Sequence, residues 1–158
     1  YGGDLTGLFE QVCKLSSFTV DFWVNIPNKI EAQFFGFGNV NTYDYHEAGE
    51  VYSYNNLGFI FLVNGYPENV SVGSYPILNR WTHVAFVLNN KRMIIYVNGI
   101  QKVTGRYDKP IISHDGLVGS IGNKSVSTQN SGPFYFCEFR VSDIARWTSN
   151  FTPPTQPY

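Results

Sequence analysis

The sequence predicts an all-β protein in which two antiparallel sheets pack as a sandwich. Short apolar runs with alternating side chains recur along the chain, and turn residues separate them at nearly regular intervals. Asn-Gly dipeptides at 64–65 and 98–99 accept the positive φ of a type I′ hairpin. No stretch has the apolar spacing of a helix of ordinary length, so paired strands must supply the core.

The stretch RWTHVAFVLNNKRMIIYVNGIQKV, residues 80–103, predicts an antiparallel meander of three strands. The strands are expected at 81–88, 92–97 and 100–103, with tight turns at 89–91 and 98–99. Their β-branched and aromatic residues at a spacing of two favour strand over helix.

Further strands are predicted on both sides of this meander, at 18–26, 33–38, 58–63, 70–72, 117–121 and 134–141. Residues 39–56 are predicted to form a long irregular loop. After the last strand, residues 142–146 are predicted to form one helical turn, with Ser142 or Asp143 as its cap.

A chain of 158 residues predicts one domain, which we place at 1–151. The proline-rich residues 152–158 are expected to be an extended tail or linker. Because the sequence begins at Tyr1 and holds a single methionine, we expect it to be one module of a longer polypeptide.

The composition limits the partners that the domain can take. Charged residues make up 15% of the chain and the net charge is −1, which argues against binding to nucleic acid through its phosphates. No apolar run approaches the roughly 20 residues that cross a bilayer, so membrane insertion is not expected.

The two cysteines, Cys13 and Cys137, are too few for a disulfide framework and lack metal-type spacing. Cys137 alternates with Phe139 and Val141 in the last strand, which predicts a small buried apolar side chain. The alternative is a bridge between Cys13 and Cys137, because the first and last strands often pair in sandwiches.

Three stretches together resemble the laminin-G-like, concanavalin A-like jelly-roll modules. They are FTVDFWVNI, the meander with W-T-H-V-A and Y-V-N-G, and FYFCEFRVSDIARWTSNFTPPTQPY at the end. The ending looks like a subgroup frequent in phage and bacterial surface proteins. The resemblance implies a two-sheet jelly roll, and it implies roles in glycan binding, adhesion or virion decoration. In relatives the position before Glu138 is often acidic, whereas here it is Cys137.

Catalysis is not expected. The glucanases of the wider superfamily need two facing carboxylates, and their E-x-D-x-x-E signature is absent. The three histidines are scattered, and no nucleophile or zinc motif surrounds them. His83, within W-T-H-V-A, is predicted to be a packed or hydrogen-bonded structural residue.

No cofactor is expected, although calcium is an alternative. Asp44, Glu47 and Glu50 in the predicted loop, or Asp115 in its glycine turn, could contribute oxygen ligands. None of them forms a recognised calcium-binding loop.

The predicted loop is also the candidate ligand-binding site, because it is rich in phenol rings, amides and an acid. Tyrosine offers contact area at low conformational cost, and amides and carboxylates can read sugar hydroxyls. The alternative is that these tyrosines pack the loop onto the sandwich. The candidate residues are Tyr43, Asp44, Tyr45, Tyr52, Tyr54, Asn55 and Asn56.

The three tryptophans, Trp23, Trp81 and Trp147, lie in framework stretches and are predicted to pack in the core or between the sheets. We therefore expect a non-catalytic recognition module of a larger extracellular or virion surface protein that binds carbohydrate through edge loops. The alternative function is a decoration or fibre domain that contacts neighbouring protein subunits without binding glycan.

Overall fold

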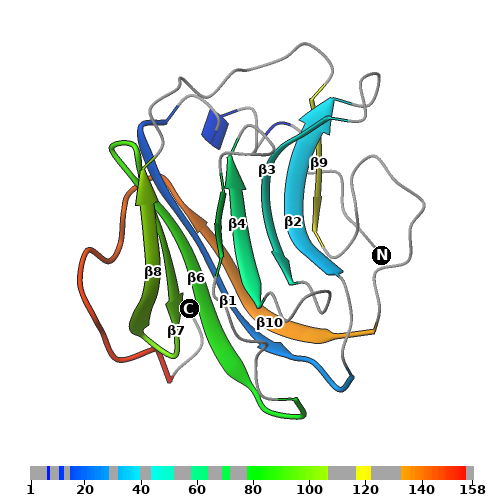
Figure 1. Ribbon diagram of the computed structural model, residues 1–158. Helices are drawn as coiled ribbons and strands as arrows, with labels where there is room; N and C mark the ends of the chain where they lie inside the picture. Colours follow the sequence, from blue (N-terminus) through cyan, green and yellow to red (C-terminus); the bar gives the residue numbers. More distant parts are fainter. Residues whose placement is uncertain are drawn as a thin grey trace.

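The computed structural model describes residues 7, 11–12, 15–28, 32–39, 44–51, 58–63, 69–71, 78–106, 117–121 and 133–155. Within these residues, ten strands form two five-stranded sheets in which all neighbouring strands run antiparallel. The sheets face each other across one core (Figure 1). This arrangement confirms the predicted all-β sandwich.

Each sheet takes strands from both halves of the chain. Sheet A has the order β10 (Tyr135–Ser142), β1 (Ser17–Asn25), β6 (Thr82–Asn89), β7 (Arg92–Val97) and β8 (Ile100–Arg106). Sheet B has the order β5 (Asn69–Ser71), β4 (Phe59–Val63), β3 (Asp44–Val51), β2 (Ala32–Asn39) and β9 (Leu117–Ile121).

The predicted meander is confirmed as β6, β7 and β8, although β8 continues to Arg106. Asn98 and Gly99 have φ values of 50° and 75°, as the type I′ turn requires. The strand at 69–71 pairs back onto β4, as predicted from the second Asn-Gly signal.

Aromatic side chains from both sheets fill the space between them. Phe22 of β1 lies 5.1 Å from Phe34 of β2, measured between ring centroids, and Phe86 of β6 lies 5.4 Å from Phe35. All four rings are 2% exposed or less. Burial of a phenylalanine of this kind contributes about 1.5–3 kcal/mol, so these contacts hold the sheets together.

A β-bulge in β2 explains why two consecutive residues, Phe34 and Phe35, both face the core. The pairing of β2 with β3 steps from Gln33↔Glu50 to Phe35↔Gly49, which leaves Phe34 as the extra residue. A bulge shifts the alternation by one residue, so both rings are buried.

A second bulge in β10 makes the prediction for Cys137 wrong. Asp21 pairs with Arg140 but Trp23 pairs with Cys137, and Glu138 has a φ of 53° within the bulge. Cys137 is therefore out of phase with Phe139, and it carries an exposed free thiol. The alternative of a bridge to Cys13 is wrong as well.

Two local predictions also differ from the structure. The segment predicted as an irregular loop, residues 39–56, contains strand β3, which pairs with both β2 and β4. Its polar, glycine-interrupted sequence hides the strand. Residues 143–146 form a bend and extended chain with no helical turn, because their backbone instead bonds to β1.

The C-terminal segment 143–153, hereafter the strap, crosses the outer face of sheet A (Figure 1). Ala145, Trp147 and Phe151 of the strap pack against a second buried cluster formed by Ala85, Val87, Ile94 and Tyr96. The strap thus gives sheet A a covered outer face. The predicted domain boundary after residue 151 stays a prediction, although Pro153 still lies beside Gly99.

Among the described residues, no helix combines the length and apolar character that a bilayer crossing requires.

Candidate functional site

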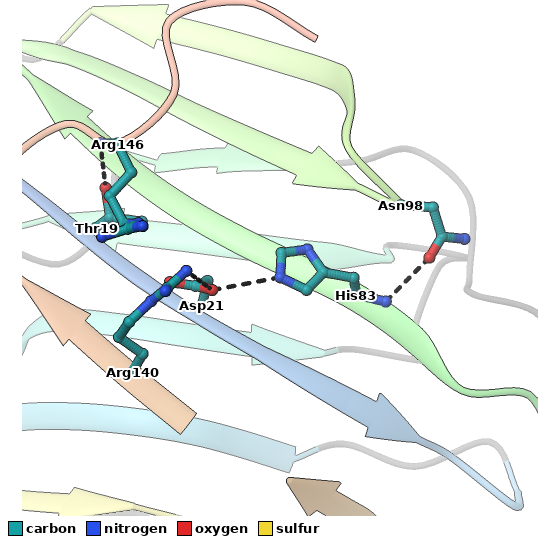
Figure 2. Close-up of polar contacts among 6 residues, drawn as sticks. All are labelled: Thr19, Asp21, His83, Asn98, Arg140 and Arg146. Carbon is teal, nitrogen blue, oxygen red and sulfur yellow. Dashed lines mark hydrogen bonds and ion pairs between the residues drawn. The ribbon is translucent and has the colours of Figure 1, made fainter. Parts of the chain in front are cut away.

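A polar cluster lies buried under the strap at the centre of sheet A (Figure 2). The Arg140 guanidinium donates to both carboxylate oxygens of Asp21, at 3.1 and 2.9 Å. The His83 Nε2 atom lies 3.3 Å from Asp21 Oδ2, and the side chains of Asp21 and His83 are fully buried. A charge this deep is stable only when it is paired and hydrogen-bonded, and this cluster supplies both.

The surroundings of His83 make the cluster structural. The rings of Trp23, Trp147 and Phe151 surround the imidazole at centroid distances of 5.4–5.8 Å. Its Nδ1 atom has no hydrogen-bond partner, and no nucleophilic side chain contacts it among the described residues. The prediction that His83 is a structural residue is confirmed.

Hydrogen bonds attach the strap at both ends. Thr19 Oγ1 donates to the carbonyl of Ile144 at 2.8 Å and accepts from the amide of Arg146 at 3.0 Å. At the other end, the amide of Phe151 donates to the carbonyl of Gly99 at 2.9 Å. These bonds fix how much of the outer face the strap covers.

Tyr96 adds a further contact from beneath the strap. Its hydroxyl donates to the carbonyl of Trp147 at 3.3 Å, and its ring lies 5.3 Å from that of Phe151. Burial raises the pKa of the Tyr96 phenol above its ordinary value of 10.0, and the positive charge of Arg92 acts in the opposite direction.

Beyond the end of the strap, the outer face of sheet A is open and aromatic. Tyr135 of β10 pairs directly with Asn25 of β1. Trp81 precedes Thr82, the partner of Val24, so Trp81 lies on the other side of Asn25. Tyr135 is 63% exposed and Trp81 is 49% exposed. We call Tyr135, Asn25 and Trp81 the aromatic row.

Strand geometry gives the aromatic row its dimensions. Neighbouring strands lie about 4.8 Å apart. Trp81 and Tyr135 are two strands apart, so they stand roughly 10 Å from each other on the same face of sheet A. Trp23 lies on the same face of β1, two residues before Asn25, and is partly exposed beside the row. Two aromatic rings with an amide between them form a flat amphipathic surface.

The loop before β6 holds one end of the row in place. The amide of Asn79 donates to the carbonyl of Ile26 at 2.9 Å, and its side-chain Nδ2 donates to the carbonyl of Pro27 at 3.2 Å. Asn79 has a φ of 58°, a conformation that asparagine tolerates better than most residues. These bonds tie the backbone before Trp81 to the end of β1.

The prediction that all three tryptophans pack in the core or between the sheets is wrong for Trp81 and for Trp23, which both lie on the outer face of sheet A. Trp147 does pack, since it stacks on Phe151 at a centroid distance of 3.9 Å, and Trp23 is half-buried against His83. Alternation on β6 places Trp81 on the same face as His83, but the strap ends before it reaches Trp81. The alternation of side chains in the sequence predicts the sheet face on which Trp81 lies, whereas only the three-dimensional structure shows where the strap ends.

The structure places two of the sequence-predicted site residues in sheet B. Asp44 and Tyr45 begin β3, where they pair with Asn39 and Gly38 of β2. The remaining candidates lie outside the described residues: Tyr43, Tyr52, Tyr54, Asn55 and Asn56. The ligand-binding role of this set stays a prediction.

The calcium alternative stays a prediction. Asp44, Glu47 and Glu50 lie on strand β3, where Glu47 and Glu50 pair with Val63 and Ile60 of β4. In the described part of the chain, no three His, Cys, Asp or Glu side chains are grouped to hold a metal ion. Asp115 lies outside the described residues.

A family model agrees with this architecture over most of the chain. The laminin G model described as the concanavalin A-like lectin/glucanases superfamily matches residues 6–149. The chain belongs to this superfamily. As a concanavalin A-like domain it shares the sandwich fold of lectins, and the superfamily also includes glucanases.

Solved structures share the fold of this concanavalin A-like domain at low sequence identity. The heptameric SAP-like pentraxin from Limulus polyphemus has a TM-score of 0.65 and 21% identity, over 83% of this chain and 65% of the pentraxin. A candidate carbohydrate binding protein from Bacteroides ovatus has a TM-score of 0.61 and 20% identity, over 84% and 39% of the two chains.

Botulinum neurotoxin type C, whose cell entry depends on interaction with two ganglioside molecules, has a TM-score of 0.56 and 21% identity. The match covers 82% of this chain and 33% of the toxin chain. The concanavalin A-like domain thus spans less than two thirds of each of these three structures. No curated protein sequence matches it.

Proposed function

We propose that this domain is a non-catalytic carbohydrate-binding module of a larger extracellular or virion surface protein, of the kind found in phage and bacterial surface proteins. The aromatic row is the observation that carries the proposal. Sugars present flat C–H patches that pack on aromatic rings, and their hydroxyls need polar partners. Trp81 and Tyr135 supply the rings, and Asn25 between them supplies an amide that can donate and accept hydrogen bonds.

The spacing of the row suits a short oligosaccharide. Rings roughly 10 Å apart can contact two sugar units along one chain. The surface is flat and open, so a bound saccharide would keep much of its surface in water. The affinity of one site should therefore be weak, and repetition of the module would raise it through avidity.

The buried cluster supports a binding role over a catalytic one. Glycoside hydrolysis needs two carboxylates about 5–10 Å apart on either side of the sugar bond. Asp21 is fully buried and bound by Arg140 and His83, so a sugar cannot reach it. No described acidic side chain belongs to the aromatic row.

A glycan array with the fluorescently labelled domain tests the proposal. We expect the parent to bind a defined group of saccharides, and Trp81→Ala and Tyr135→Ala each to weaken that binding at least about tenfold, as for loss of an interface aromatic. A Tyr52→Ala/Tyr54→Ala variant tests the sequence-predicted set in the same experiment. Absence of binding by the parent, or equal binding by the Trp81 and Tyr135 variants, would contradict the proposal.

The second candidate function is a decoration or fibre domain, and the exposed end of β10 favours it. Tyr135 and Phe136, with exposed fractions of 63% and 40%, lie on an edge strand of sheet A, where another protein subunit could pack. Light scattering separates the two functions. Self-association that Tyr135→Ala abolishes, without any sugar binding, would favour the decoration role.

A further inference from the structure

A pocket lies where the strap leaves β10, and we call it the strap pocket. Its volume is about 430 Å³, within the range of about 300–1,000 Å³ that small-molecule sites occupy. At this end of β1, Thr19 pairs with Ser142 of the pocket lining, whereas Asn25 of the aromatic row pairs with Tyr135. Since six residues of β1 separate Thr19 from Asn25, the pocket lies roughly 20 Å from the row and is a separate site.

The buried part of the pocket lining is apolar. Val12 is 3% exposed and belongs to the main core cluster, and the partly buried Leu15 and Val141 pack against that cluster. The amide of Leu15 donates to the carbonyl of Val12 at 3.0 Å, which holds these two residues in one turn. Ile144 of the strap lines the same pocket but is 55% exposed. An aliphatic ligand would cover Ile144 and remove apolar surface from water.

Two side chains of opposite charge also line the pocket. Asp143 and Arg146 are exposed, and within the part of the chain that the structure describes neither side chain forms an ion pair or a hydrogen bond. The Arg146 guanidinium lies over the Trp147 ring, 5.6 Å from its centroid. The pocket therefore offers an acceptor for an ammonium group and a set of donors for a carboxylate.

The backbone that carries the two charges is held in place. Thr19 bonds to the carbonyl of Ile144 and to the amide of Arg146, so both hydrogen bonds fall within this stretch. Asp143 and Arg146 are three residues apart, so their Cα atoms lie at most roughly 10 Å from each other. By the same rule, the two charged ends of an extended peptide of two or three residues are separated by roughly 7–10 Å. Groups that are fixed before binding lower its entropic cost.

We propose that the strap pocket binds a short aliphatic peptide of two or three residues, with its free amino terminus on Asp143 and its terminal carboxylate on Arg146. The aliphatic side chains of the peptide pack on Val12, Leu15 and Ile144. A neutral sugar leaves both charges of the pocket without a partner, and an aliphatic anion such as a fatty acid leaves the Asp143 carboxylate unpaired. A zwitterion with an apolar body satisfies the whole lining. This proposal does not depend on saccharide binding at the aromatic row.

Titration of the ¹⁵N-labelled domain with the dipeptide Leu-Leu, followed by two-dimensional NMR, tests the proposal. We expect the amide signals of residues 142–146 to shift with a Kd of about 0.1–1 mM, as for a small ligand in an open pocket, and the Trp81 indole signal to stay unchanged. N-acetyl-Leu-Leu and Leu-Leu-amide each lack one terminal charge and should bind about threefold to tenfold more weakly. Unshifted signals at 142–146, or equal affinity for the three peptides, would overturn the proposal.

Matched variants assign the two ends of the peptide. Asp143→Asn should weaken Leu-Leu binding about as much as N-acetylation does, and N-acetylation should then cost nothing further in this variant. Arg146→Gln should behave in the same way toward Leu-Leu-amide. Arg80→Gln removes an exposed cation beside the aromatic row and should bind Leu-Leu as the parent does.

The Asp143→Asn variant also separates a lost contact from a damaged fold. Because the Asp143 side chain has no partner among the described residues, the variant should keep the Tm of the parent. Losses from Asp143→Asn and from N-acetylation that simply add, or an equal loss in Arg80→Gln, would show that the amino terminus does not lie on Asp143 and would overturn the proposal.

Discussion

The imidazole of His83 on β6 and the carboxylate of Asp21 on β1 lie 3.3 Å apart, and neither is accessible to solvent. Trp23↔His83 and Asp21↔Ala85 are paired positions of neighbouring strands, so the contact is diagonal across the outer face. The strap closes over it through Trp147 and Phe151. The contact thus joins the sheet to the segment that covers it.

Asp21→Ala should lower the free energy of unfolding by about 3–5 kcal/mol, because it leaves Arg140 and His83 without their shared acceptor. Urea denaturation followed by circular dichroism measures the change. Asn25 lies on the same face of β1, four residues after Asp21. Asn25→Ala is therefore the matched control and should change the free energy of unfolding by about 0.5 kcal/mol or less. Equal losses of unfolding free energy in the two variants would show that the buried cluster of Asp21, His83 and Arg140 does not stabilise the fold more than an ordinary residue of the outer face does.

Gly99→Ala should be destabilising by about 1–3 kcal/mol and should loosen the strap. The φ of 75° at this position disfavours a side chain, and the added Cβ would overlap the carbonyl oxygen of Phe151. Lys91→Gly is the control. Lys91 has a φ of 71° in the turn between β6 and β7, and glycine relieves the strain at this φ.

Thermal unfolding and limited proteolysis of the strap measure the effects of Gly99→Ala and of its control Lys91→Gly. Gly99→Ala should lower Tm and speed cleavage between residues 143 and 155, whereas Lys91→Gly should leave both unchanged or raise Tm. Unchanged proteolysis in Gly99→Ala would mean that the contact between Gly99 and Phe151 does not anchor the strap.

The raised pKa of Tyr96 predicts a loss of stability at alkaline pH. Because the phenol ionises more readily in the unfolded chain, its contribution is complete below the ordinary value of 10.0 and is lost as pH rises through the folded pKa. Tyr96→Phe should cost about 1 kcal/mol at neutral pH through the lost hydrogen bond to Trp147.

The free energies of unfolding of the parent and Tyr96→Phe should therefore converge as pH rises above 10. Denaturant unfolding at a series of alkaline pH values measures this difference. Tyr135→Phe, which alters an exposed phenol, is the control and should follow the parent at every pH. Parallel curves for parent and Tyr96→Phe would contradict the prediction.

Much of sheet A could be predicted from the sequence, because its strands are rich in β-branched and aromatic residues with clean alternation. The bulges at Phe34 and Glu138 could not, since one extra residue reverses the alternation without any change in composition. The wrong prediction that the Cys137 side chain is buried follows directly from the bulge at Glu138. Strand β3 was missed because its acids, histidine and glycine have low strand propensity.

The candidate site could be predicted only in part. The face on which Trp81 lies follows from alternation on β6, but its exposure depends on where the strap ends. The strap has no regular secondary structure, and its anchors, Thr19 and Gly99, lie far from it in sequence. No local pattern reveals contacts of this kind.

Chemical-shift mapping of the indole N–H groups tests the central claim of a saccharide-binding aromatic row most directly. The domain contains three tryptophans, so a ¹⁵N-labelled sample gives three indole signals. During titration with a saccharide selected on the array, the signal of Trp81 should shift strongly and that of Trp147, stacked on Phe151 beneath the strap, should not. A static Trp81 signal in a titration that shows binding elsewhere would contradict the account.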